Sequence, residues 1–154
     1  MKLAELMDER CVLLDMPVSS KEQLFHDVIH EFEAADVMAE PEAALKAVLK
    51  RESVMSTGIG GGVAIPHAQS PAVSKLVVGL IRPKTPIDFD ALDGRPVSLV
   101  FMILGPEERG GFVRVLARIS RLLYDGELVG RLLSARTPRD AIAVIARKEE
   151  EART

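Results

Sequence analysis

The two stretches that decide the fold are residues 76–81, LVVGLI, and residues 97–104, VSLVFMIL. Each is a short apolar run bounded by proline or glycine, a pattern that is typical of buried strands. The segment between them is rich in turn-forming residues at 88–96, so we expect a turn to join the two strands. Residues 11–15, CVLLD, form a shorter strand candidate. The centre of the chain therefore predicts a sheet.

The region before these strands predicts two amphipathic helices. The first covers residues 21–36, where Ser19 or Ser20 can cap the start, and its apolar positions recur at spacings of three and four: Leu24, Phe25, Val28, Ile29 and Phe32. Pro41 occupies a favourable first position for the second helix, which we expect to end near Arg51.

The region after the strands predicts three more helices. The first follows Gly111 with apolar residues from Phe112 to Leu123, a short one covers 128–133, and Thr137 with Pro138 starts a helix that runs to Arg147. Helices on both sides of the strands in the sequence imply a sheet covered on both faces. We therefore predict an α/β three-layer sandwich, with residues 1–148 as one domain and residues 149–154 as a charged, solvent-facing tail.

Composition narrows the possible functions. The chain has 154 residues, of which 47% are hydrophobic and 28% charged, as in ordinary soluble domains. A net charge of -3 gives no reason to expect nucleic acid, because that binding depends on basic surfaces. No apolar run predicts membrane insertion, and the start, MKLAELMDERC, does not resemble a signal peptide, so we expect a cytoplasmic protein. The single cysteine, Cys11, is expected to act as a small apolar residue.

The segment that carries the chemistry is residues 51–67, RESVMSTGIGGGVAIPH. Four glycines in the five positions 58–62 predict a tight, exposed loop without regular structure. An anion could be held by the arginine fork of Arg51 and by the loop, through the hydroxyls of Ser56 and Thr57 and the backbone N–H groups of Gly58 and Gly60.

His67 supplies a nucleophile beside this predicted anion site. Histidine is largely neutral at cytosolic pH and can form covalent intermediates through a ring nitrogen. Pro66 restricts the backbone just before it and helps to hold the ring at a strand end. The glycine run lacks the Gly-Lys-Ser/Thr sequence of nucleotide-binding loops, so the pattern favours a phosphoryl group on histidine over a bound nucleotide.

Several segments together resemble the enzyme IIA domains of the bacterial phosphoenolpyruvate-dependent sugar phosphotransferase system, in the fructose/mannitol class and nearest to its nitrogen-regulatory branch. The resemblance covers nearly the whole chain, and it is carried by the following segments: Arg51-Glu52, Ser56-Thr57-Gly58-Ile59-Gly60, Ala64-Ile65-Pro66-His67, Pro86 to Asp90, Gly94 to Val97, and the late helix from Leu116 to Leu123.

The resemblance implies a mixed sheet, a phosphoryl-accepting histidine at His67 and a phosphate-stabilising arginine at Arg51. It also implies a histidine-containing phosphocarrier protein as donor, with a sugar-specific domain or a regulated protein target downstream, and no metal or organic cofactor. The protein would be a phosphocarrier rather than a multi-turnover enzyme. Because the chain is about one domain long, the resemblance favours a separate regulatory protein over dedicated sugar transport.

Phe112 departs from the family pattern. Many members have a second histidine at the start of the late helix, and the alignment of Leu116 and Ile119 puts Phe112 at that position. An apolar ring cannot donate a hydrogen bond to a phosphoryl group. The alternative function is therefore a regulatory interaction module that keeps the fold without being phosphorylated. A hydrolase that uses His67 as a general base is not favoured, because the sequence shows no obvious acid, set of metal ligands or nucleophile to act with it.

Two other groups of side chains have a simpler interpretation. His26 and His30 lie four residues apart, but on the polar face of the first predicted helix and without a third ligand, so we expect them to face solvent rather than a metal. Arg114, Arg118 and Arg121 form a stripe on the late helix. This stripe is either a solvated polar face or a docking surface for an acidic partner.

Overall fold

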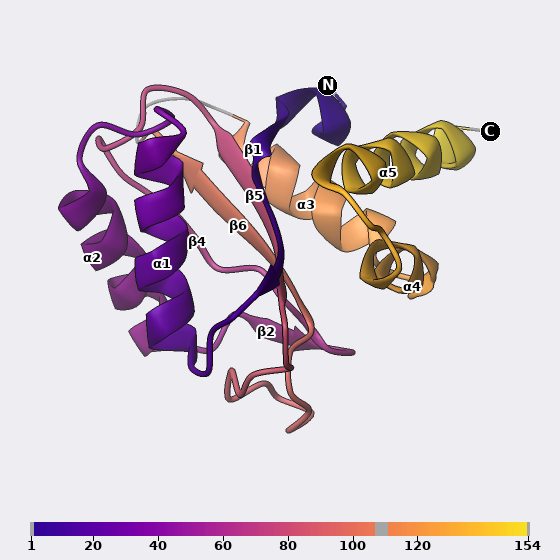
Figure 1. The fold of residues 1–154 in the computed structure, drawn as a ribbon, viewed down its shortest axis with the longest axis horizontal. Helices are drawn as coiled ribbons and strands as arrows, with labels where there is room; N and C mark the ends of the chain where they lie inside the picture. The colour runs from indigo at the N-terminus through magenta and orange to yellow at the C-terminus, as the bar shows by residue number, and fades with distance from the viewer. Residues whose placement is uncertain (1, 107–110, 154) are drawn as a thin grey trace.

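The computed structural model describes residues 2–106 and 111–153, and it has a central sheet with helices on both faces (Figure 1). The helices α1 and α2 cover one face, and α3, α4 and α5 cover the other. This arrangement confirms the predicted three-layer α/β sandwich. The helical elements are η1 (Leu3–Leu6), α1 (Lys21–Ala34), α2 (Pro41–Val54), α3 (Phe112–Leu122), α4 (Glu127–Leu133) and α5 (Pro138–Arg153).

The sheet is mixed, as the family resemblance implied. Its strands are β1 (Met7–Met16), β2 (Gly58–Gly60), β3 (Val63–Ala64), β4 (His67–Gln69), β5 (Val77–Pro83) and β6 (Leu99–Gly105). The order is β1-β5-β6-β3-β2, with β4 also paired to β6. β5 and β6 are antiparallel, and β3 and β4 run parallel to β6 one after the other. Every residue of β5 and β6 is buried, in agreement with the two apolar runs.

The helices form where the sequence predicts them, with small differences at their ends. The apolar face of α1 is buried as expected, but the helix ends two residues early because Asp36 adopts a left-handed φ of 60°. α2 continues one turn past Arg51 to Val54. In α3 the buried positions are Phe112, Val115, Ile119 and Leu122, and Val113 is exposed.

The glycine run corrects one prediction. Residues 58–60 form β2, a short strand antiparallel to β3, and Thr57 and Gly58 are buried. Glycine tolerates an extended edge position when the neighbouring strand supplies the hydrogen bonds. The tight turn lies one or two residues later, where Gly60, Gly61 and Gly62 have φ values of 94°, 66° and 82°. Only the second half of the run is therefore the irregular loop that the sequence predicts.

The predicted charged tail also differs from the structure. α5 extends through Arg153, so residues 149–153 belong to the helix. Glu149 is almost fully buried and accepts hydrogen bonds from the backbone N–H groups of Leu3 and Ala4 and from Nε of Arg118. This carboxylate links η1 and α3 to α5, and these hydrogen bonds stabilise the part of α5 that follows Arg147. None of the helices within residues 2–106 and 111–153 is long and apolar enough to span a membrane.

Candidate functional site

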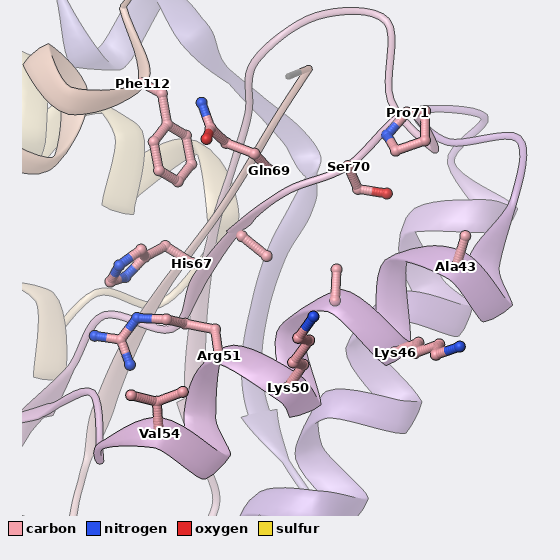
Figure 2. Close-up of a pocket in the computed structure, with 12 residues that line it drawn as sticks. Ala43, Lys46, Lys50, Arg51, Val54, His67, Gln69, Ser70, Pro71 and Phe112 are labelled. Carbon is pink, nitrogen blue, oxygen red and sulfur yellow. The ribbon is translucent and has the colours of Figure 1, made fainter.

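A pocket of about 800 Å³ lies at the edge of the sheet, between α2 on one side and the start of α3 on the other (Figure 2). β4 forms its floor, because this short strand pairs with β6 and packs beside α2. Figure 2 shows Phe112, His67 and Arg51 at one end of the pocket and Lys46, Ala43 and Pro71 at the other. The pocket therefore joins side chains from both helical layers.

The backbone around His67 is held firmly by β6. Pro66 has no N–H to donate, but its carbonyl accepts a hydrogen bond from the N–H of Ile103 at 3.0 Å. His67 then lies opposite Ile103 in the parallel ladder between β4 and β6. This pairing fixes the point at which the imidazole leaves the sheet and enters the pocket.

A hydrogen bond also fixes the tautomer of the neutral ring. Nδ1 of His67 lies 2.7 Å from the carbonyl oxygen of Ile65, and a carbonyl oxygen can only accept. In the neutral ring the proton is therefore on Nδ1, and Nε2 carries the free lone pair. The half-buried ring thus has one nitrogen engaged with the backbone and one available for chemistry.

Arg51 lines the same pocket from the last turn of α2. One of its guanidinium nitrogens, Nη1, donates to the carbonyl of Met55 at 2.9 Å, where α2 ends. This bond satisfies a carbonyl at the helix terminus and uses one of the five guanidinium donors. The remaining N–H groups can donate hydrogen bonds to an anion at the His67 end of the pocket.

The residue after Arg51 anchors this end of α2. The buried carboxylate of Glu52 accepts hydrogen bonds from the backbone N–H of Thr57 at 3.0 Å and from its hydroxyl at 2.6 Å, and it pairs with Lys21 at 3.3 Å. The ammonium of Lys21 also pairs with Asp90 and lies 5.8 Å from the ring centre of Phe89. Burial alone would lower the pKa of Lys21, but the carboxylates of Glu52 and Asp90 raise it. The network keeps α2 fixed against the segment that follows it.

The structure does not bring the predicted loop donors to the pocket. The hydroxyl of Ser56 donates to the carbonyl of Phe89, and the N–H of Gly58 donates to the oxygen of Ser56. Thr57 is occupied by Glu52, and Gly60 lies on a different surface beside α3 and α4. The donors of Ser56, Thr57 and Gly58 already have partners, so these three residues act as structural supports. The family motif therefore marks the anchor of α2 here rather than an anion loop.

Phe112 lies where the alignment predicts it. It is the first residue of α3, and its ring centre lies 5.9 Å from that of His67, with the planes tilted by 55°. The ring is 8% exposed and lines the pocket. This side of the pocket is therefore apolar.

The remaining candidates lie away from the pocket. His26 and His30 are exposed on α1, as predicted, and no cluster of three metal-ligating side chains occurs in the part of the chain that the structure describes. Arg118 is paired with Glu149 at 2.6 Å, so the centre of the arginine stripe has a structural role. Sequence reasoning missed Lys46 and Lys50, which look like ordinary polar positions of α2 until the pocket is seen.

Comparison with known proteins decides the family. Residues 5–148 match the family described as the phosphoenolpyruvate-dependent sugar phosphotransferase system, EIIA 2. The chain belongs to this family. Relatives of the EIIA 2 family that are similar to this chain have names from both the nitrogen-regulatory and the fructose-specific branches, which supports a phosphoryl-carrier or regulatory role.

The similarity extends over nearly the full length of these EIIA relatives. A nitrogen regulatory protein of Bradyrhizobium diazoefficiens is 35% identical over 148 residues, which cover 95% of each chain. The fructose-specific EIIA component of Haloferax volcanii is 36% identical over 136 residues, which cover 88% of each. The crystal structure of the nitrogen regulatory protein IIA-Ntr of Neisseria meningitidis has a TM-score of 0.86 and 30% identity, covering 93% of this chain and 98% of that one.

Proposed function

We propose that the protein carries a phosphoryl group on Nε2 of His67, accepted from a phosphorylated histidine-containing carrier protein. The observation that carries the proposal is the hydrogen bond from Nδ1 of His67 to the carbonyl of Ile65, which leaves the Nε2 lone pair free. In the transfer, Nε2 forms a bond to phosphorus as the bond from phosphorus to the donor's ring nitrogen breaks. The electron pair of the broken bond returns to the donor nitrogen, and the proton of His67 stays on Nδ1, which donates it in the hydrogen bond to the Ile65 carbonyl.

Arg51 stabilises the transferring group in this proposal. Phosphoryl transfer depends mainly on positioning and on neutralising the charge on the phosphoryl oxygens. Arg51 is held at one nitrogen by the Met55 carbonyl, and its other donors lie at the His67 end of the pocket. A planar fork can contact two phosphoryl oxygens together, which a lysine cannot do.

Downstream of His67 we propose transfer to a sugar-specific EIIB domain or a signal to a regulated protein target. A relative named as a nitrogen regulatory protein and one named as a fructose-specific EIIA component are 35% and 36% identical to this chain, so both kinds of recipient are retained. The exchange takes place in the cytoplasm, where phosphoenolpyruvate, the phosphoryl source named for the family, is produced.

The test is a phosphorylation assay with the purified full chain. Incubation with phosphoenolpyruvate, enzyme I and the histidine-containing carrier should add the mass of one phosphoryl group, and the His67→Ala variant should gain none. The variant should keep the wild-type circular dichroism spectrum, because the ring is only half-buried at a pocket wall. A His67→Ala protein that is labelled to the same extent as the wild type would refute the assignment.

A second candidate rests on Phe112. Its ring places an apolar surface 5.9 Å from His67, where it cannot donate to a doubly charged phosphoryl group. This supports a protein that signals through binding alone and keeps His67 unmodified. The two candidates differ in one outcome, because only the carrier gains a phosphoryl group in the assay above.

A further inference from the structure

Gln69 shares one face of β4 with His67. Side chains alternate along a strand, so residues two apart lie on the same face, about 6.6 Å from each other. In β4 the side chain between them, Ala68, is 7% exposed and packs in the core, whereas His67 is half-buried and Gln69 is exposed. Gln69 therefore projects from the floor of the pocket on the same side as the imidazole, and it lines the pocket (Figure 2).

The backbone of Gln69 is held in place by β6. Gln69 lies opposite Gly105 in the ladder between β4 and β6, and the next N–H, that of Ser70, donates to the Gly105 carbonyl at 2.8 Å. A Cβ at Gly105 would lie 3.0 Å from the ring of Phe112, so the missing side chain leaves room for this ring over the end of β6. Gln69 and Phe112 are therefore neighbours in the pocket (Figure 2).

The carboxamide of Gln69 is a donor without a protein partner. It carries two N–H donors, and it makes no hydrogen bond within residues 2–106 and 111–153. Figure 2 shows Arg51 on one side of the His67 ring and Gln69, with Phe112, on the other. An exposed side chain changes rotamer within nanoseconds, so this amide can turn toward a group bound to the ring.

We propose that the carboxamide of Gln69 donates a hydrogen bond to the phosphoryl oxygen that the Arg51 fork does not contact. The inference rests on the proposed function, since it assumes a phosphoryl group on Nε2 of His67. The ring of Phe112 keeps water from one side of this bond, and a hydrogen bond is electrostatically stronger where the local dielectric is low. The floor of the pocket thus supplies the donor that its apolar wall lacks.

The equilibrium between phosphorylated and free protein isolates this contact. When the chain exchanges phosphoryl groups with the histidine-containing carrier until the exchange is complete, the final ratio does not depend on how the two proteins dock. It depends on the interactions that the phosphoryl group makes in each protein. A change in this ratio therefore separates a hydrogen bond to the phosphoryl group from a contact with the carrier.

Three variants test the contact, with intact mass as the measure of the phosphorylated fraction. Gln69→Met keeps the length of the side chain but removes the donors, and it should lower the ratio of phosphorylated to free protein about tenfold. Gln69→Lys restores a donor and adds a positive charge, so its ratio should equal or exceed that of the wild type. Gln23→Met makes the same change at an exposed position of α1 outside the pocket, and it should keep the wild-type ratio.

NMR observes the same hydrogen bond directly. The glutamines of the chain are Gln23 and Gln69, and the sequence has no asparagine, so the side-chain amide spectrum contains two NH₂ groups. Phosphorylation should move an amide proton of Gln69 downfield and leave those of Gln23 in place.

The possible outcomes separate this inference from the proposed function. An unchanged ratio in Gln69→Met, a reduced ratio that Gln69→Lys does not restore, or Gln69 amide signals that do not move would each overturn the inference and leave the phosphorylation of His67 intact. A wild-type protein that gains no phosphoryl group in the exchange would refute the proposed function, and this inference with it.

Discussion

Replacing Phe112 by His tests whether the apolar wall beside His67 limits phosphorylation. The Phe112 ring centre lies 5.9 Å from that of His67, so an imidazole there could donate a hydrogen bond to a phosphoryl group between the two rings. A charge-assisted hydrogen bond contributes roughly 1.5 kcal/mol. The packing lost when Phe112 is replaced affects the phosphorylated and free proteins alike, so it cancels in the phosphorylation equilibrium. We therefore expect the phosphorylated-to-free ratio to rise about tenfold.

The assay is an equilibrium titration of the protein with phosphorylated carrier, in which intact mass gives the phosphorylated fraction. Phe112→Leu is the control, because it removes the ring without adding a donor, and it should stay near the wild-type ratio. If Phe112→His takes up no more phosphoryl groups than wild type and Phe112→Leu, the wall of the pocket does not act on the phosphoryl group. If none of the three proteins is phosphorylated, the interaction-module function replaces the carrier.

Three further substitutions test the surroundings of the site and the stability of the fold. Arg51→Ala should slow phosphorylation by the carrier more than Arg51→Lys does, because lysine restores the charge without the fork; equal stopped-flow rates in all three proteins would exclude Arg51 from the reaction. Glu52→Ala should lower the free energy of unfolding by about 3 kcal/mol, because it leaves the buried Thr57 donors without their acceptor and removes one of the two carboxylates that pair with Lys21; urea denaturation measures the loss, and a change below about 0.5 kcal/mol would contradict it. Hydrogen bonds from the side chain and the backbone N–H of Arg10 lower the pKa of Asp8 from 3.8 to about 2, so this pair stabilises the fold above pH 4 and less as the pH falls through 2; Arg10→Ala removes the side-chain bonds and keeps the backbone bond, so NMR should show the pKa of Asp8 rising towards 3.8, and an unchanged midpoint would refute the pairing.

Most of the fold could be predicted because its signals are local. The apolar runs at 76–81 and 97–104 became β5 and β6, and the apolar spacing of residues 21–36 became the buried face of α1. The family resemblance added the mixed sheet, which depends on strand order and cannot be obtained from periodicity. The prediction of a loop failed at residues 58–60 for a tertiary reason: these residues form β2 because β3 pairs with them, despite glycine's weak preference for strands.

Polar contacts between residues far apart in the chain also could not be predicted from the sequence. Arg82 lies in an apolar strand and is 9% exposed, yet one of its nitrogens donates to the carbonyls of Leu132, Leu133 and Ala135 at the end of α4. Its other guanidinium nitrogens donate to the carboxylate of Asp15. All of these acceptors lie 50 residues or more away, so nothing near Arg82 in the sequence identifies them. Glu149 is similar, because two of its partners, Leu3 and Ala4, lie at the other end of the chain.

The candidate site was predicted in part. The proposed nucleophile His67, its neighbour Phe112 and the cation Arg51 do line one pocket. The loop donors do not, because the side chain of Glu52 satisfies Thr57 and turns this segment into a support. Lys46 could not be predicted as a pocket residue, since an exposed lysine on a helix carries no signal of what lies opposite it.

The most direct test of the central claim is to identify the ring nitrogen that carries the phosphoryl group. The carbonyl of Ile65 holds the proton on Nδ1 of His67, so the account predicts that only Nε2 is phosphorylated. With ¹⁵N-labelled protein phosphorylated by the carrier, phosphorus coupling in the imidazole NMR spectrum should appear at Nε2 of His67, while Nδ1 keeps its bond to hydrogen. Coupling at Nδ1, or at a ring nitrogen of His26 or His30, would contradict the account.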